Sequence, residues 1–174
     1  FDVLKNEQGI MDFNPLKPQV YALDFNGDGK TEVMSVFDDG AASVASKVYE
    51  FTYSGGSFNC NNIFQTNTIN NDLEFFPGDY NGDGITDLIS WGTPSYYHIR
   101  FGTGTAFTSS VPITNISNNS DNPNASLRDD NLVFGDYNKD GKTDFIKFHC
   151  QSIGTGGSST MELYYSRGDG TFNK

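Results

Sequence analysis

Asp79-Tyr-Asn-Gly-Asp-Gly-Ile-Thr-Asp87 decides the fold, because the chain contains this Asp-rich stretch three times. Asp24-Phe-Asn-Gly-Asp-Gly-Lys-Thr-Glu32 begins 55 residues earlier, and Asp136-Tyr-Asn-Lys-Asp-Gly-Lys-Thr-Asp144 begins 57 residues later. Self-similarity at such a period is typical of repeat architectures, in which one supersecondary unit recurs along the chain. Three copies of one unit therefore account for nearly the whole sequence.

Short β-prone runs surround each Asp-rich stretch. The runs before it are residues 20–23, 73–76 and 132–134, and those after it are residues 33–36, 88–91 and 145–148. A third run leads into a Gly-rich turn that is followed by a Phe: residues 48–53, 96–101 and 161–165. Four short strands per unit, joined by turns in which Gly supplies positive φ, predict an all-β fold of four-stranded antiparallel blades, as in a β-propeller.

The same register predicts the domain boundaries. We expect one propeller segment over residues 1–174, with blade one at residues 20–72, blade two at 73–131 and blade three at 132–174. Residues 1–19 are expected to supply the fourth strand and connector of a preceding blade. Because rings of propeller blades have about four to eight members, the three blades are expected to belong to a larger propeller or to self-associate.

Each Asp-rich stretch has the donor atoms of a cation site. We number each stretch from its first Asp as position one. Oxygen ligands then come from the side chains at positions one, three, five and nine and from the carbonyl at position seven. An all-oxygen set favours Ca²⁺ over Mg²⁺ or Zn²⁺. Position twelve, where an EF-hand needs an acid, is Ser35, Ser90 or Lys147, so the loop enters a strand instead of a helix. A tight turn by itself requires only one or two of these residues. It does not explain why all three copies carry an oxygen-bearing side chain at each of the four positions.

These residues make the chain similar to a known family. The phrases "GDYNGDGITDLI" and "YYSRGDGTF" resemble the FG-GAP or VCBS repeats of integrin alpha-chain propellers and of secreted bacterial proteins, including RHS-linked and Tc-type toxin B components. The resemblance covers essentially all of the chain. It implies a calcium-stabilised β-propeller, usually seven-bladed, that acts in adhesion, in ligand binding or as a casing for another domain.

By motif match, the resemblance implies about three Ca²⁺ ions, one per repeat. The implied ligands are Asp24, Asn26, Asp28, the Lys30 carbonyl and Glu32; Asp79, Asn81, Asp83, the Ile85 carbonyl and Asp87; and Asp136, Asn138, Asp140, the Lys142 carbonyl and Asp144. Glu32 departs from the usual Asp at position nine, which changes the geometry expected of that loop.

Composition excludes several classes of function. With 22 acidic and 11 basic residues the formal net charge is −11, so nucleic acid is not an expected partner, and no apolar run is long enough for membrane insertion. Two cysteines, Cys60 and Cys150, lack a CxxC motif, which leaves a single bridge or two buried thiols open. His98 and His149 lie in no catalytic motif, so we expect no enzyme. The hairpin turn alone explains the adhesion-type tripeptide at residues 167–169.

The sequence therefore predicts a non-enzymatic, calcium-binding scaffold or interaction module of a larger secreted or cell-surface protein. Calcium loops of modest affinity fill where calcium is plentiful, which indicates an extracellular location. We expect a protein or glycan ligand on the face opposite the calcium loops, where the connecting segments vary most in length: residues 37–47, 59–72, 92–95, 108–130 and 149–160. The alternative is a carbohydrate-binding or carbohydrate-active propeller that uses loop carboxylates and tyrosines.

Overall fold

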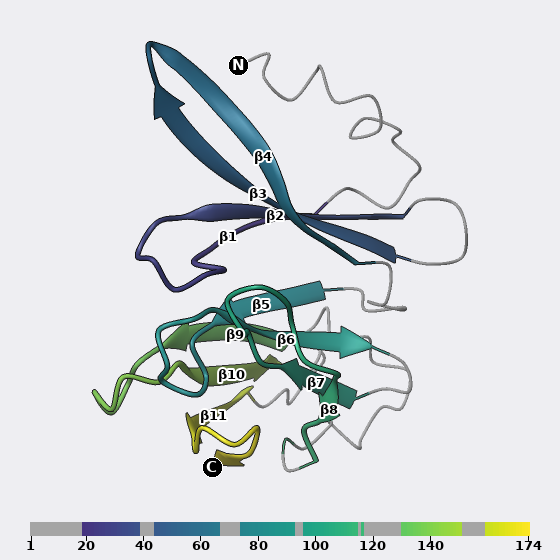
Figure 1. Cartoon of the computed structure of the whole chain (residues 1–174). Helices are drawn as coiled ribbons and strands as arrows, with labels where there is room; N and C mark the ends of the chain where they lie inside the picture. Colours follow the sequence, from purple (N-terminus) through teal and green to yellow (C-terminus); the bar gives the residue numbers. More distant parts are fainter. Residues whose placement is uncertain are drawn as a thin grey trace. The chain divides into compact units, whose positions relative to one another are not determined.

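The computed structural model describes residues 19–38, 44–66, 74–92, 96–114, 116, 130–150 and 159–174, and every regular element in these ranges is a β-strand (Figure 1). The strands of the first repeat are β1 (Gln19–Leu23), β2 (Glu32–Asp38), β3 (Val44–Ser54) and β4 (Ser57–Thr66). Those of the second are β5 (Glu74–Gly78), β6 (Asp87–Gly92), β7 (Tyr96–Arg100) and β8 (Val111–Pro112). Those of the third are β9 (Asp130–Gly135), β10 (Asp144–Cys150), β11 (Ser159–Ser166) and β12 (Phe172–Asn173).

Each repeat forms its own four-stranded sheet. The strands lie in sequence order, from β1 to β4, from β5 to β8 and from β9 to β12, and every neighbouring pair whose register is known is antiparallel. This confirms the predicted all-β class of four-stranded blades. In all three sheets the Asp-rich loop joins the first strand to the second. Within the described part of the chain, no helix is long and apolar enough to cross a bilayer.

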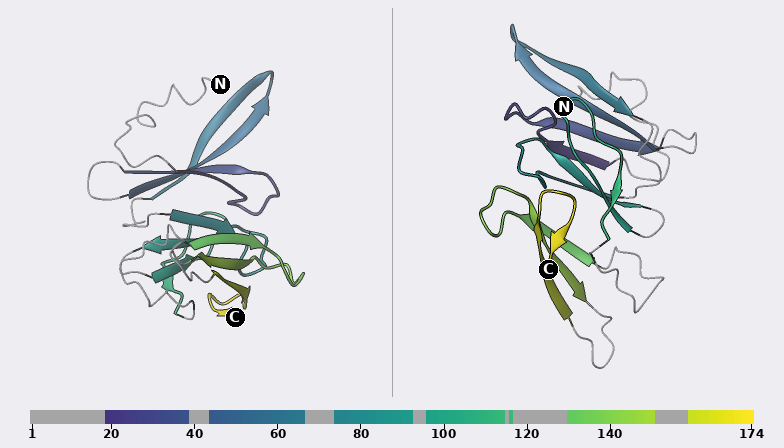
Figure 2. Two further views of the ribbon diagram at one scale, coloured as in Figure 1. Left: turned by 180° about the vertical axis from the view of Figure 1, so that it is seen from behind. Right: turned by 60° about the horizontal axis from the view of Figure 1, so that its bottom comes forward.

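Contacts divide the chain into two compact units, which Figures 1 and 2 show from three directions. One unit comprises Phe1–Ala22 and Glu32–Asn71, and the other comprises Leu23–Thr31 and Asp72–Lys174. The second unit therefore contains the first Asp-rich loop as far as Thr31, together with the second and third sheets. Residues 1–18, which the sequence assigns to a preceding blade, lie outside the described residues.

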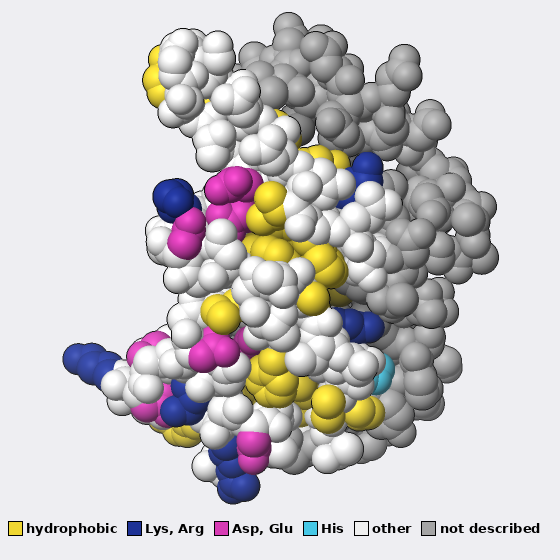
Figure 3. Space-filling model, in the orientation of Figure 1, with side chains coloured by type: hydrophobic (Ala, Val, Ile, Leu, Met, Phe, Trp, Pro, Cys, Tyr) yellow, Lys and Arg dark blue, Asp and Glu magenta, His cyan; other side chains and the backbone are white. Residues whose placement is uncertain are grey.

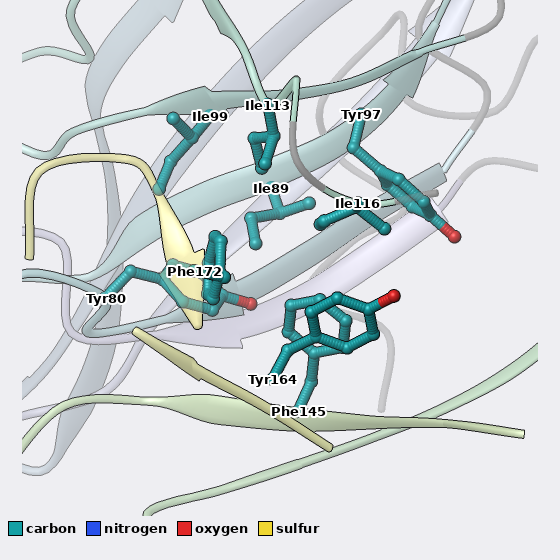
Figure 4. Packing of buried hydrophobic residues seen from close by; sticks show 9 residues of the cluster. All are labelled: Tyr80, Ile89, Tyr97, Ile99, Ile113, Ile116, Phe145, Tyr164 and Phe172. Atoms are coloured by element: carbon teal, nitrogen blue, oxygen red, sulfur yellow. The ribbon is translucent and has the colours of Figure 1, made fainter. Parts of the chain in front are cut away.

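An aromatic and aliphatic core holds the second and third sheets together (Figure 4). Its buried members are Tyr80, Ile89, Tyr97, Ile99, Ile113, Ile116, Phe145, Tyr164 and Phe172. The Phe145 and Tyr164 rings stack with centroids 4.8 Å apart, and Phe172 meets Phe145 edge-on at 5.1 Å. Two strand tyrosines, Tyr97 and Tyr164, are buried in this core. Such large apolar surfaces are the main source of stability in a repeat array.

The first sheet ends in a projecting ribbon. Strand β2 pairs with β3 only over residues 44–49, whereas β3 continues to pair with β4 as far as Ser54 and Ser57. The free part of this hairpin extends beyond β1 and β2 (Figure 1). At its tip the Tyr53 and Phe58 rings lie 4.7 Å apart, with exposed fractions of 66% and 71%. Two large aromatic side chains are therefore presented to solvent.

Candidate cation site in the Asp-rich loops

The second loop shows how these residues fold back on themselves. Asp79 accepts hydrogen bonds from the backbone N–H groups of Gly82 and Asp83 through Oδ1, at 2.7 and 3.2 Å, and from Gly84 through Oδ2, at 2.8 Å. Asn81 Oδ1 accepts from the Asp83 N–H at 2.9 Å, and Asp83 Oδ1 accepts from the Ile85 N–H at 2.8 Å. Side chains of this type favour such local bonds to backbone N–H groups two or three residues ahead. The first, third and fifth positions therefore surround one turn.

The first and third loops repeat this network. Asp24 accepts from Gly27, Asp28 and Gly29, while Asp136 accepts from Asp140 and Gly141, all between 2.8 and 3.1 Å. The Asn at position three accepts from position five in both loops at 3.0 Å, and position five accepts from the Lys at position seven at 2.9 Å. One arrangement is therefore built three times from the same residue types.

Position nine differs from the other three side chains because it is buried beneath the loop. Asp87 and Asp144 have an exposed fraction of 0%, and Glu32 of 1%. Asp87 Oδ2 accepts from the N–H groups of Tyr80 and Asn81 at 2.9 and 3.2 Å, while Oδ1 accepts from Gly102 at 2.8 Å. Asp144 likewise accepts from Tyr137 at 3.0 Å and from Ser166 at 2.9 Å.

These bonds give the position-nine carboxylate a structural role that the sequence analysis missed. It ties the start of its loop to the end of the third strand of the same sheet, where Ser166 is the last residue of β11 and Gly102 follows β7. Gly102 approaches so closely that an added Cβ would lie 2.4 Å from the Thr86 carbonyl oxygen. The only sequence signal for this role was an acid followed 15 or 22 residues later by the Gly-rich turn.

The electrostatic environment of Asp87 combines burial with the charges of two other carboxylates in its loop. Burial raises its pKa to about 6, hydrogen bonds from Gly102 and Tyr80 oppose the rise, and the negative charges of Asp83 and Asp79 add to it. A buried carboxylate near two others is destabilised in its ionised form. A cation placed among these groups would have the opposite effect and would favour ionisation.

The fifth position carries an ion pair in two of the three loops. Lys30 Nζ lies 2.6 Å from Asp28 Oδ2, and Lys142 Nζ lies 2.7 Å from Asp140 Oδ2. Hydrogen bonds from Lys30 and Lys142 hold the pKa values of Asp28 and Asp140 below their usual range. In the second loop position seven, which is Lys in the other two, is the uncharged Ile85. In the space-filling view acidic and basic side chains gather along the edge from which the loops of Figure 1 project (Figure 3).

The donor set of the second loop fits a hard cation. A carboxylate has about four lone-pair sites and an amide oxygen has two. The bonds described above leave capacity on Asp79 Oδ2, on Asn81 Oδ1 and on both oxygens of Asp83, and the Ile85 carbonyl belongs to the same turn. Among the described residues no three His, Cys, Asp or Glu side chains converge into a ready-made metal cluster. The candidate site therefore depends on the Asn side chain and a backbone carbonyl as well as on carboxylates.

The tripeptide at residues 167–169 lies in the turn between β11 and β12. Gly168 has a φ of 84°, and Asp169 Oδ1 accepts from the Thr171 N–H at 2.9 Å and from the Thr171 hydroxyl at 2.6 Å. Arg167 Nε donates to Asn173 Oδ1 at 2.7 Å. Each side chain of the tripeptide thus has a place in the hairpin, as the turn interpretation predicts.

Comparisons with known proteins agree with this geometry. A family model described as an FG-GAP-like repeat matches residues 24–90 and again residues 79–146. A solved structure, described as the basis of specific recognition of non-reducing terminal N-acetylglucosamine by an Agrocybe aegerita lectin, superposes with a TM-score of 0.62 at 18% sequence identity. The match covers 93% of this chain and 38% of that chain. Comparison with curated proteins gave no significant match.

Proposed function

Because this chain belongs to the FG-GAP-like repeat family, we propose that it is a calcium-binding, non-enzymatic interaction module of a larger secreted or cell-surface protein. One observation carries the proposal: the same oxygen-rich turn is built three times, around Asp24, Asp79 and Asp136, with unused lone pairs on its carboxylates. Oxygen donors from flexible side chains and a carbonyl suit Ca²⁺. About three ions, one per loop, would change the formal net charge from −11 to about −5.

Calorimetric titration of the metal-free chain with Ca²⁺ tests this proposal directly. We expect about three binding events, with dissociation constants of roughly 10⁻⁴ to 10⁻³ M if the module works extracellularly. Mg²⁺ should bind more weakly, because it requires a tighter octahedral shell and retains its waters. Absence of heat and of any stabilisation at 10 mM Ca²⁺, on folded protein, would contradict it.

Lysine at position seven should weaken calcium binding, because its ammonium already neutralises the position-five carboxylate. In the Asp83→Ala/Asp140→Ala background the first loop is the only intact one. There, Lys30→Ile should raise the Ca²⁺ affinity about 3- to 10-fold at low salt, since it removes one positive charge near a divalent ion. The reciprocal variant, Ile85→Lys in an Asp28→Ala/Asp140→Ala background, should lower the affinity of the second loop. Equal affinities in each pair would show that the ion pair does not compete.

The ligand face is the second part of the proposal. The Asp-rich loops and the Gly-rich turns lie together. An added Cβ at Gly104 would lie 3.5 Å from the Asn26 carbonyl oxygen, and one at Gly168 would lie 3.5 Å from the Asn81 carbonyl oxygen. We place a protein or glycan ligand on the opposite face, where the connectors vary in length. Much of that face, residues 39–43, 67–73, 93–95, 115, 117–129 and 151–158, lies outside the described residues.

A hydrogen-exchange footprint of a bound partner would test this assignment. Protection is expected at the ends of β2, β6 and β10 and in the segments that follow them. Protection centred on the three Asp-rich loops would contradict the assignment. A chelator control is needed, because calcium itself would protect the loop amides.

An alternative carbohydrate site, on the exposed rings of Tyr53 and Phe58, lies at the β3–β4 turn and thus at the same end of its sheet as the Asp-rich loop. Aromatic faces with a polar tip are suited to surfaces that are partly apolar and partly wet, and sugars have such surfaces. A glycan array that includes N-acetylglucosamine-terminated chains should then detect binding that is lost in Tyr53→Ala and kept in Tyr137→Ala. A polysaccharide-cleavage assay on the same protein distinguishes a binding module from an enzyme.

A further inference from the structure

The Asp-rich loops contact one another through a repeated backbone bond. The Thr86 N–H, at position eight of the second loop, donates to the Asp24 carbonyl oxygen of the first at 2.9 Å. The Thr143 N–H of the third loop donates in the same way to the Asp79 carbonyl oxygen at 2.6 Å. Each loop therefore offers a donor to the loop before it and an acceptor to the loop after it, so the contact has a direction.

A side-chain contact accompanies each bond. Position four is Gly27 in the first loop and Gly82 in the second, with φ values of 75° and 81°. An added Cβ at Gly27 would lie 3.0 Å from Ile85 Cγ1, and one at Gly82 would lie 3.1 Å from Lys142 Cγ. The position-seven side chain of the following loop thus occupies the space that the glycine leaves open. We call this pair of contacts the loop joint.

The first and third loops each have one side that makes no loop joint with another described loop of the chain, and these two sides differ. The third loop has Lys139 at position four, with a φ of 64°, where the other loops have glycine. A side chain in this backbone region is uncommon. By analogy with Gly27 and Gly82, the Lys139 Cβ would crowd a position-seven side chain placed as Ile85 and Lys142 are. The first loop presents the other half, because Thr31 is exposed and the Lys30 side chain has an exposed fraction of 70%.

We propose that the row of Asp-rich loops connected by these joints, the loop stack, extends in one direction only. A further Asp-rich loop with Gly at its fourth position docks on Lys30 and Thr31, and no further loop docks in this way on Lys139. The occupant is therefore a blade of the same repeat type that precedes the first one. A second copy of this chain does not qualify, because the fourth positions of its first two loops are already filled and its third loop carries Lys139. Through this joint the chain should not self-associate.

The joint itself is tested by a matched pair of substitutions in the full chain at saturating Ca²⁺. Gly27→Ala and Gly29→Ala both place a side chain at a φ near 75–79°, but an added Cβ at Gly29 meets no atom within 4 Å. Backbone strain is thus common to both variants, and only Gly27→Ala disturbs Ile85. Gly27→Ala should melt roughly 3–6 °C below Gly29→Ala. Equal melting temperatures would overturn the loop joint.

The direction of the loop stack is tested by Lys139→Gly, which gives the third loop the position-four glycine that the first two loops have. Sedimentation velocity over a range of concentrations should show head-to-tail association of Lys139→Gly that the unmodified chain lacks. Adding Lys30→Gly, which removes the position-seven side chain but keeps its carbonyl, should abolish that association. The proposal is overturned if Lys139→Gly sediments like the unmodified chain, or if its association survives Lys30→Gly.

Discussion

Chelation of calcium is expected to lower the melting temperature of this chain by about 20 °C from its value in Ca²⁺ at 100 times the dissociation constant, roughly 10 to 100 mM, and the same Ca²⁺ concentration should restore it. A ligand that binds only the native state contributes about 2.7 kcal/mol when present at 100 times its dissociation constant. Three such sites would contribute roughly 8 kcal/mol, and each kcal/mol corresponds to about 2–4 °C in a protein of this size. The physical source is neutralisation of carboxylates such as Asp79, Asp83 and Asp87, which otherwise repel one another.

Single-loop variants divide this effect into its parts. Asp83→Ala and Asp140→Ala should each remove one Ca²⁺ and leave the other two, so each loses about a third of the calcium-dependent stabilisation. Asp169→Ala is the matched control, because Asp169 is an exposed turn aspartate with local hydrogen bonds but lies outside the three loops. An unchanged melt after chelation of protein shown to be metal-free would refute the calcium proposal for all three loops.

The fold was predictable because its determinants are local. Alternating apolar runs, positive-φ glycines and the repeated loop define strands and hairpins without reference to neighbours. The strands around Asp79 to Asp87 accordingly follow the predicted order. The candidate site was predictable as a set of oxygen donors for the same reason, since positions one, three and five meet within a single turn.

The roles of position nine and position four could not be read from one repeat. Asp87 accepts a bond from Gly102, and Gly27 packs against Ile85, so both roles depend on a second segment that the tertiary fold brings close. The Lys139 substitution appears in the sequence as a minor departure from the motif. Its meaning emerges only when the glycine at the same position is seen to contact the next loop.

The aromatic residue at position two provides the largest single-residue test of this arrangement. Tyr80 is fully buried, its hydroxyl donates to the Phe76 carbonyl oxygen at 3.0 Å, and its ring meets Phe172 of the next blade edge-on at 6.2 Å. Tyr137 has the same motif position in the third loop, but its exposed fraction is 40%. One residue type in one motif position therefore has two environments.

Tyr80→Ala should lower the free energy of unfolding by about 3–5 kcal/mol, because it leaves a cavity in the core between the second and third sheets. Tyr137→Ala should cost at most about 1 kcal/mol, since 40% of the residue is already exposed and its hydroxyl bond to the Val133 carbonyl oxygen lies at the surface. Denaturant unfolding at saturating Ca²⁺ measures both, and calcium titration checks that each variant keeps its ions. Similar losses in the two variants would mean that burial under the following blade does not set the energetics of this position. A large loss for Tyr137→Ala alone would mean that the third loop is covered in solution by a surface that pairs with it as Phe172 pairs with Tyr80.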